Sequence, residues 1–141
     1  MRILILNGPN LNLLGSREPH IYGRTSFDDY LPQLKAAFPQ ASIALRQSNV
    51  EGELVEALQQ AIGQYDAVVL NAAGYSHTSI ALRDIVATMT IPVVEVHISN
   101  IHAREEFRHN SLTGGVSKGV ISGLGLDGYR LAIDHLLRSI P

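Results

Sequence analysis

A glutamate and a histidine two residues apart lie at the end of an apolar stretch, Pro92–Ile98, which is typical of a buried strand. Side chains two apart on a strand point to the same face, so we expect the Glu95 carboxylate to accept a hydrogen bond from one imidazole nitrogen of His97. The other nitrogen would then be available for proton transfer. A Glu–His pair that serves only structure is one alternative. A metal site is another, but neither the spacing of the histidines nor any carboxylate cluster supports it.

A long polar segment, Asn7–Arg24, follows the first apolar run of the chain. Loops of this length in compact domains are more often functional than not. Gly15 and Gly23 flank Arg17 and Tyr22, and glycines at both ends of a segment suit a lid that moves. A solvated surface loop is the alternative interpretation. A positive charge beside a tyrosine favours the phenolate, so Tyr22 is a candidate base for removing a proton next to a carbonyl, with His97 as the acid.

Arginines outnumber lysines among the cationic residues, since only two of the 11 are lysines, Lys35 and Lys118. Arg suits planar recognition of carboxylates, whereas so few lysines make Schiff-base chemistry poorly supplied. Arg104 and Arg108 are four apart on an expected helix, so they would share a face and could clamp an anion. The alternative for these two arginines is a solvated helical face paired with neighbouring glutamates.

The elements that must position these residues alternate between short apolar runs and amphipathic segments. We expect strands at Ile3–Leu6, Ser42–Gln47, Ala67–Leu70, Pro92–Ile98 and Gly119–Ser122, and helices at Ser26–Phe38, Glu53–Ile62, Ser79–Thr88, about Ile101–Arg108 and Leu126–Arg138. Strands buried on both sides and alternating with helices indicate a five-stranded parallel sheet covered on both faces. The predicted fold is therefore an α/β, flavodoxin-like, doubly wound sheet whose ligand crevice lies at the carboxyl ends of the strands. Pro32 should kink the first helix or delay its start.

Three loops at that end of the predicted sheet hold most of the polar residues singled out above: Asn7–Arg24, Asn71–Thr78 and His97–Arg108. The backbone N–H groups of Ile98 and Ser99, at an expected helix start, form a natural cradle for a carboxylate. Gly123–Gly128 matches G-x-G-x-x-G, but the chain is too short beyond it for the acidic residue of a dinucleotide site. We interpret that motif as a tight turn with close helix–sheet contact.

The composition describes one globular domain, residues 1–141, with 45% hydrophobic and 17% charged residues. A net charge of −2 gives no basic field for nucleic acid, and the absence of cysteine excludes thiol chemistry and disulfides. No signal peptide, lipidation motif or membrane-spanning run is visible, so we expect a cytoplasmic protein.

Four blocks of the sequence resemble type II 3-dehydroquinate dehydratase: NGPNLNLLGSREPHIYG, RQSNVEGEL, NAAGYSHTSIALRD and IPVVEVHISNIHAREEFRHNS. The similarity extends over essentially the whole chain. It implies a flavodoxin-like fold and dehydration of 3-dehydroquinate, a small anion, to 3-dehydroshikimate by anti elimination through an enolate. It also implies neither cofactor nor metal, and a homo-oligomer that is a dodecamer of four trimers.

The resemblance further implies roles for individual residues. Tyr22 would remove the C2 proton with Arg17 beside it, and Asn10 would hold a water that stabilises the enolate. His97, oriented by Glu95, would protonate the departing hydroxyl. The residues that would bind substrate or support the lid are Asn71, His77, Asp84, Ile98, Ser99, Arg104 and Arg108, with Asp84 approaching from a neighbouring subunit.

A non-catalytic flavodoxin-like module that binds a small anion is the competing hypothesis. A receiver module needs an acidic pocket after the first strand, where this chain has Asn7 and Asn10. A flavin binder needs a hydroxyl- and glycine-rich phosphate loop there, which Arg17–Gly23 is not. A catalytically idle relative is a third possibility, but the intact set of Arg17, Tyr22, Glu95 and His97 argues against it.

Overall fold

The computed structural model describes residues 1–140 and contains a five-stranded, all-parallel sheet with strand order β2-β1-β3-β4-β5. The strands are β1 (Arg2–Asn7), β2 (Ser42–Gln47), β3 (Ala67–Asn71), β4 (Val93–His97) and β5 (Gly119–Ser122). The chain moves outward on one side of β1 and then crosses over to build the other side. The flavodoxin-like fold expected from the alternating pattern is therefore confirmed.

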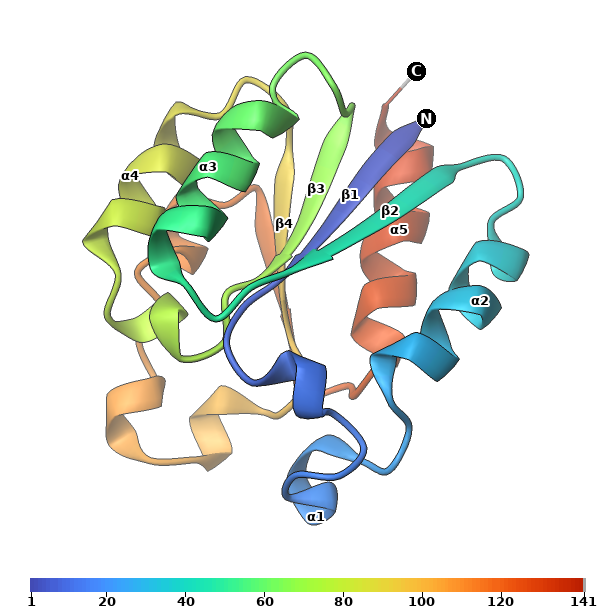
Figure 1. Ribbon diagram of the computed structural model, residues 1–141. Coiled ribbons are helices and arrows are strands. Elements are labelled where there is room, and N and C mark those ends of the chain that lie inside the picture. The colour runs from blue at the N-terminus through green and yellow to red at the C-terminus, as the bar shows by residue number, and fades with distance from the viewer. Residues whose placement is uncertain (141) are drawn as a thin grey trace.

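Helices cover both faces of the sheet (Figure 1). On one face α2 (Phe27–Ala37) and α5 (Asp127–Ser139) enclose a core that includes Ile3, Ile5 and the fully buried Tyr129. On the other face α3 (Glu51–Ala61) and α4 (Ile80–Thr88) pack over the alternate residues of the same strands. Burial on both faces explains why β1 and β3 are mostly apolar in sequence.

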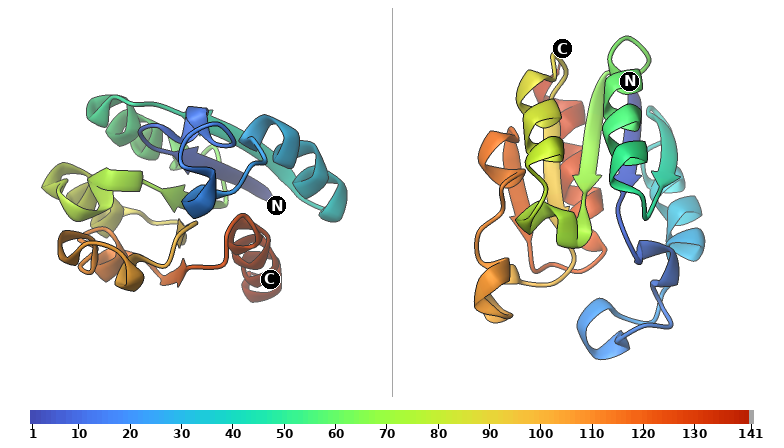
Figure 2. Two further views of the ribbon diagram at one scale, coloured as in Figure 1. Left: turned by 90° about the horizontal axis from the view of Figure 1, so that it is seen from below. Right: turned by 60° about the vertical axis from the view of Figure 1, so that its left-hand side comes forward.

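The carboxyl ends of the strands and their loops gather at one end of the molecule, opposite both labelled termini (Figures 1 and 2). The segment after β1 contains a 3₁₀ turn, Leu11–Leu13, and a four-residue helix, α1 (Pro19–Tyr22). Neither was expected from the sequence, because each is too short to show a periodic pattern. The remaining 3₁₀ turns are Ala73–His77, Ile101–Ala103, Glu106–Arg108 and Gly114–Val116.

Hydroxyl caps fix where two helices begin. Ser26 accepts from the backbone N–H of Asp29, and Ser79 accepts from that of Leu82, which satisfies donors that a helix start leaves free. Pro32 does not delay the start of α2, which begins at Phe27 and runs through the proline.

The single helix expected at Ile101–Arg108 is wrong. Asn100 caps a first 3₁₀ turn through His102, but Arg104 is extended, with φ −111° and ψ −164°, and a second turn begins at Glu106. Arg104 and Arg108 therefore lie on two separate turns and not on one helical face. A four-residue spacing predicts a shared face only when the helix is continuous.

The glycine-rich turn before α5 is structural, as expected. Gly123 has φ +91°, and a Cβ there would lie 2.9 Å from the Cβ of Asn100. A Cβ on Gly128 would lie 3.0 Å from Cγ1 of Val96, so the helix approaches the sheet closely at this point. The three glycines of this motif thus serve a tight turn and helix–sheet packing.

Candidate active site

A pocket of about 120 Å³ opens at the carboxyl ends of β1, β3 and β4. It brings together side chains from all three loops that the sequence singled out. Ten of the twelve predicted site residues line it: Asn10, Arg17, Tyr22, Asn71, His77, His97, Ile98, Ser99, Arg104 and Arg108. The location agrees with the general rule for ligand crevices in doubly wound sheets.

His97 and Glu95 form a buried pair on the face of β4 that α3 and α4 cover. Nε2 of His97 lies 2.7 Å from Oε2 of Glu95, and the two side chains are 5% and 0% exposed. Because Nε2 donates to the carboxylate, Nδ1 is the nitrogen left for proton transfer at the pocket. Glu95 does not line the pocket itself and acts through the imidazole.

The Glu95 carboxylate has further partners, which sequence reasoning missed. Ser111 donates to Oε2 at 2.7 Å, and Thr113 donates to Oε1. Burial opposes ionisation of this carboxyl, but the hydrogen bonds from His97, Thr113 and Ser111 and the charge of His97 together hold the pKa of Glu95 below its ordinary value. Glu95 is thus held as a carboxylate beside the imidazole of His97.

His77 stacks on His97 with ring centroids 5.9 Å apart and planes at 27°. Its Nδ1 lies 2.9 Å from the carbonyl oxygen of Asn110, which only accepts, so Nδ1 is protonated and Nε2 is an acceptor. Burial lowers the pKa of His77, and the nearby charges of His97 and Arg108 lower it further. His77 is therefore a neutral hydrogen-bonding group beside the acid.

Tyr22 lines the pocket from α1, whereas His97 lines it from the end of β4. Nη1 of Arg104 donates to its phenolic oxygen at 2.7 Å, and the Arg104 guanidinium also lies over the ring, 5.4 Å from the centroid. Arg17 was expected to lie beside this tyrosine. Arg17 lines the same pocket, but its ion-pair partner is Glu18 at 3.7 Å, and Arg104 holds the hydroxyl.

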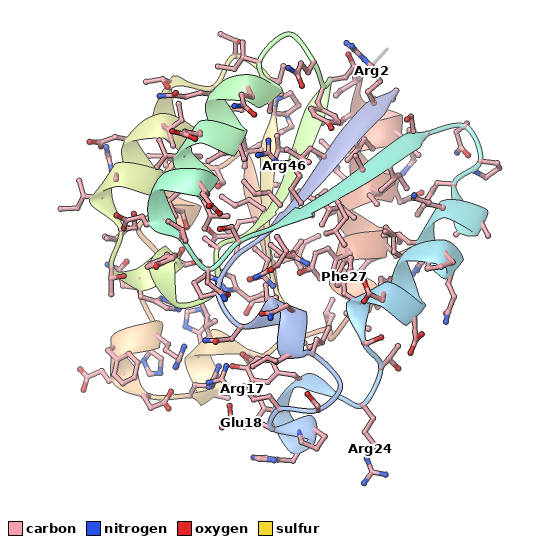
Figure 3. The ribbon with its side chains drawn as sticks, in the orientation of Figure 1. Arg2, Arg17, Glu18, Arg24, Phe27 and Arg46 are labelled. Atoms are coloured by element: carbon pink, nitrogen blue, oxygen red, sulfur yellow. The ribbon has the colours of Figure 1, made fainter. Side chains whose placement is uncertain are left out.

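Figure 3 shows the side chains of Arg17 and Glu18 at the lower edge of the molecule and Arg24 pointing away from it into solvent. The α1 segment closes on itself, since a Cβ on Gly15 would lie 2.9 Å from the carbonyl oxygen of Arg24. No residue from Gly15 to Thr25 is buried. The side of the pocket that holds Tyr22 is therefore a self-contained surface segment.

The floor of the pocket is fixed by a buried polar chain. Asn71 Nδ2 donates to the Tyr129 hydroxyl at 2.9 Å, and that hydroxyl donates to Oδ1 of Asn7 at 2.8 Å. Oδ1 of Asn71 accepts from the backbone N–H of Ala73. Asn71 keeps one amide hydrogen for a ligand. Tyr129 lies in α5, so no local motif in the sequence links it to the loops.

Cations and free donors gather on the wall made by the residues after β4. Arg108 donates to Glu105 at 2.8 Å, and Arg104 also reaches Ser99 Oγ at 3.4 Å. Within residues 1–140, no turn or loop hydrogen bond uses the backbone N–H of Ile98 or Ser99. These two donors have no partner of that kind, and the anion cradle suggested by the sequence stays a prediction.

Two of the predicted residues, Asn10 and Asp84, make contacts outside the pocket. Asn10 has a left-handed backbone, φ 69°, and its N–H donates to Oδ1 of Asn49 at 3.0 Å. This contact between loops was not predicted from the sequence. Asp84 lies on the surface of α4, where it pairs with Arg83 at 3.1 Å with its side chain 65% exposed, and it does not line this pocket.

Within residues 1–140, no cluster of three or more His, Asp or Glu side chains is arranged to hold a metal ion. In the same part of the chain, no helix combines the length and apolarity needed to cross a bilayer.

The fold and the pocket define a class: a flavodoxin-like α/β protein with a buried Glu–His pair and an arginine-lined pocket at the carboxyl ends of its strands. Comparison with known proteins narrows this class. The family model described as dehydroquinase class II matches residues 1–137. The chain belongs to this family, and the expectation that it is an enzyme of this kind is confirmed.

Individual relatives agree. The chain is 49% identical over 141 residues to a 3-dehydroquinate dehydratase of Tolumonas auensis, covering 99% of this chain and 93% of that one. It is 46% identical to catabolic 3-dehydroquinase 1 of Fusarium vanettenii, covering 98% and 97%. The crystal structure of the type II dehydroquinase from Propionibacterium acnes superposes with a TM-score of 0.94 at 44% identity, covering 98% and 97%.

Proposed function

We propose that this chain catalyses the dehydration of 3-dehydroquinate to 3-dehydroshikimate in the shikimate pathway, by anti elimination through an enolate. The observation that supports this most strongly is that Tyr22 and His97 line one pocket and that each is paired with a charged side chain. Arg104 donates to the Tyr22 oxygen, and Glu95 accepts from His97. A cationic donor at the phenolic oxygen and a carboxylate at the imidazole suit a base and an acid in one pocket.

The proposed steps balance without a redox change. The Tyr22 phenolate takes the proton from C2, and the electrons of the C2–H bond form an enolate with the neighbouring carbonyl. The enolate collapses to place a double bond between C1 and C2, and the C1–O bond breaks. Nδ1–H of His97 protonates the departing hydroxyl, which leaves as water, and the Tyr22 and His97 protons are then exchanged with solvent.

The remaining pocket residues bind the substrate in this proposal. The free N–H groups of Ile98 and Ser99, with the Ser99 hydroxyl, hold the carboxylate. Nε2 of His77 accepts from a ring hydroxyl, and Asn71 donates its remaining amide hydrogen to another. Arg108 binds a third position on the ring.

Three further residues act on the enolate and on the lid. Asn10 holds a water at the enolate oxygen, and Arg17 supplies positive charge beside it. Arg104 joins the α1 segment to the residues after β4 through its hydrogen bond to Tyr22.

We also propose that the active form is a cytoplasmic dodecamer of four trimers in which Asp84 reaches the pocket of a neighbouring subunit. Ile80 and Asp84 are four apart on α4 and both are 65% exposed, so they form one surface that combines an apolar and an acidic group. A native mass twelve times that of the 15.3 kDa chain would support this assembly. A monomer that turns over at full rate would contradict it.

The experiment that tests the function follows the conjugated enone absorbance of the product when purified protein meets 3-dehydroquinate. We expect turnover that survives treatment with borohydride and substrate together, because the two lysines of the chain, Lys35 and Lys118, do not line the pocket. Absence of turnover from folded, assembled protein would instead support a non-catalytic module that binds a small anion. Loss of activity after borohydride would replace the enolate route by a Schiff base.

A further inference from the structure

A short segment outside the pocket, Asn110–Thr113, contacts His77 directly and contacts Glu95, the partner of His97. The carbonyl of Asn110 accepts from Nδ1 of His77 at 2.9 Å. Ser111 and Thr113 donate to the two oxygens of Glu95. The segment is itself anchored, because the Leu112 N–H donates to the carbonyl of Ser76 at 2.7 Å. None of these four residues lines the pocket.

The Glu95 carboxylate is fully enclosed, so its charge depends on these contacts. Oε2 accepts from Nε2 of His97 and from Ser111, and Oε1 accepts from Thr113, which is itself 0% exposed. A buried carboxylate without such donors becomes a neutral acid.

Gly114 makes this close approach possible. A Cβ at that position would lie 2.7 Å from Oε2 of Glu95 and 3.1 Å from Oγ of Ser111. Any other residue would therefore push into the carboxylate or displace the serine. Ser111 and Thr113 thus place two hydroxyls around the Glu95 carboxylate, and the missing side chain of Gly114 leaves room for it.

We propose that Ser111 and Thr113 are positioning residues for the acid step: their hydroxyls hold Glu95 as a carboxylate and thereby keep His97 able to carry the proton that it donates. This inference rests on the proposed function. The two hydroxyls act through Glu95 and His97 and do not touch the substrate. Without them the charge opposite Nε2 is weakened, and the imidazolium loses stabilisation relative to the neutral ring.

The other charged and titratable groups that line the pocket come from the neighbouring loops, and apart from Tyr22 they are histidine or arginine. His77 stacks on it from the Ala73–His77 turn, and Arg108 approaches from the Glu106–Arg108 turn. Arg104 and Arg17 add positive charge across the pocket, beside Tyr22. Glu95 is the one carboxylate that contacts His97 in the described residues, so its ionisation decides whether the acid is charged. The lowered pKa of Glu95 agrees with this arrangement.

The test measures kcat and KM against pH for Thr113→Val and Ser111→Ala. Thr113→Val keeps the shape of the side chain and removes the hydroxyl. We expect kcat to fall about tenfold or more at neutral pH, since hydrogen bonds to charged groups are the strong ones, while KM changes less than about twofold. We also expect the descending limb of the kcat profile, where the acid loses its proton, to move to lower pH. Thr113→Ser restores the hydroxyl and should restore both the rate and the profile.

Matched controls remove hydroxyls elsewhere. Thr88 and Ser139 donate only to backbone carbonyls within α4 and at the end of α5, so Thr88→Val and Ser139→Ala should leave the rate and the pH profile unchanged. A fall in kcat with an unchanged descending limb, or a loss that Thr113→Ser does not restore, would overturn the proposal. If Thr113→Val does not fold, the pH profile of Ser111→Ala, a change at a half-buried position, tests the proposal by itself. Wild-type turnover tests the proposed function separately, because an active wild type with unshifted variants removes only the role of Ser111 and Thr113.

Discussion

The two sides of the pocket are built in opposite ways. The side of the proposed acid consists of His97 and Glu95 on β4, an inner strand of the sheet, with both carboxylate oxygens of Glu95 paired. The side of the proposed base consists of Tyr22 on a four-residue helix in a segment, Gly15–Thr25, that contains no buried residue. The phenolic oxygen is held by one contact, from Arg104. The acid is therefore preorganised by the core, whereas the base is placed by a few surface contacts.

This difference has a functional reason. In the proposed reaction a substrate enters and water is excluded, which a movable wall would allow, and segments with little buried apolar surface open at low cost. The acid pairs with a buried charge, which is costly unless its partners are fixed. Placing the fixed charge on the sheet and the base on the surface segment separates these two requirements.

The largest expected effect comes from the base. Tyr22→Phe should lower kcat by about 10³-fold or more, because positioned general bases contribute on the order of 10²–10⁴-fold, and should leave KM and the thermal midpoint nearly unchanged. Steady-state kinetics and thermal unfolding check this. The matched control is Tyr65→Phe, outside the pocket, which should keep full activity. Appreciable retained rate in Tyr22→Phe would remove Tyr22 as the base.

The second effect tests the acid side. Glu95→Gln keeps the shape but removes the charge opposite Nε2 of His97, so kcat should fall about 10²-fold, and the thermal midpoint should also fall because a buried network is disturbed. A loss of both activity and stability would distinguish this side from Tyr22, where only activity is lost. Glu56→Gln, on the exposed face of α3, is the control. Wild-type kcat in Glu95→Gln would show that His97 needs no charged partner.

A third, smaller effect concerns the closure of the surface segment. Gly15→Ala forces a left-handed φ of +95° on alanine and places a Cβ 2.9 Å from the Arg24 carbonyl oxygen. Gly63→Ala imposes a similar φ of +86° in open space, away from the pocket. Both variants should lose about 1–2 kcal/mol of folding stability from backbone strain. Only Gly15→Ala should also lower kcat/KM, by about tenfold. Equal kinetics in the two variants would mean that the fold of this segment does not position Tyr22.

The smallest effect is on stability against pH. Glu95 has a pKa lowered in the folded protein, so its contribution to the free energy of unfolding is present above its ordinary pKa, about 4.3, and is lost as pH falls through the folded value. Denaturant titrations between about pH 6 and pH 3 should therefore show wild type losing stability more steeply than Glu95→Gln. The reverse order would mean that burial raises this pKa and that the hydroxyls of Ser111 and Thr113 do not compensate.

The sequence by itself determined the fold and most of the pocket. Apolar strands alternating with amphipathic segments allow few arrangements, and parallel strands bring their carboxyl ends to one edge, so loops far apart in the sequence were expected to meet there. The period of two on β4 predicted the Glu95–His97 contact, because neighbours on one strand face are set by local geometry.

Only the tertiary structure decided which side chains support that pair. Ser111 and Thr113 are 16 and 18 residues from Glu95, and Tyr129 is 58 residues from Asn71, so no local pattern links them. Arg104 and not Arg17 holds Tyr22, because the helix expected at Ile101–Arg108 breaks at the extended Arg104. Local periodicity fixes the faces of regular elements, whereas contacts between irregular loops depend on how the whole chain closes around the sheet.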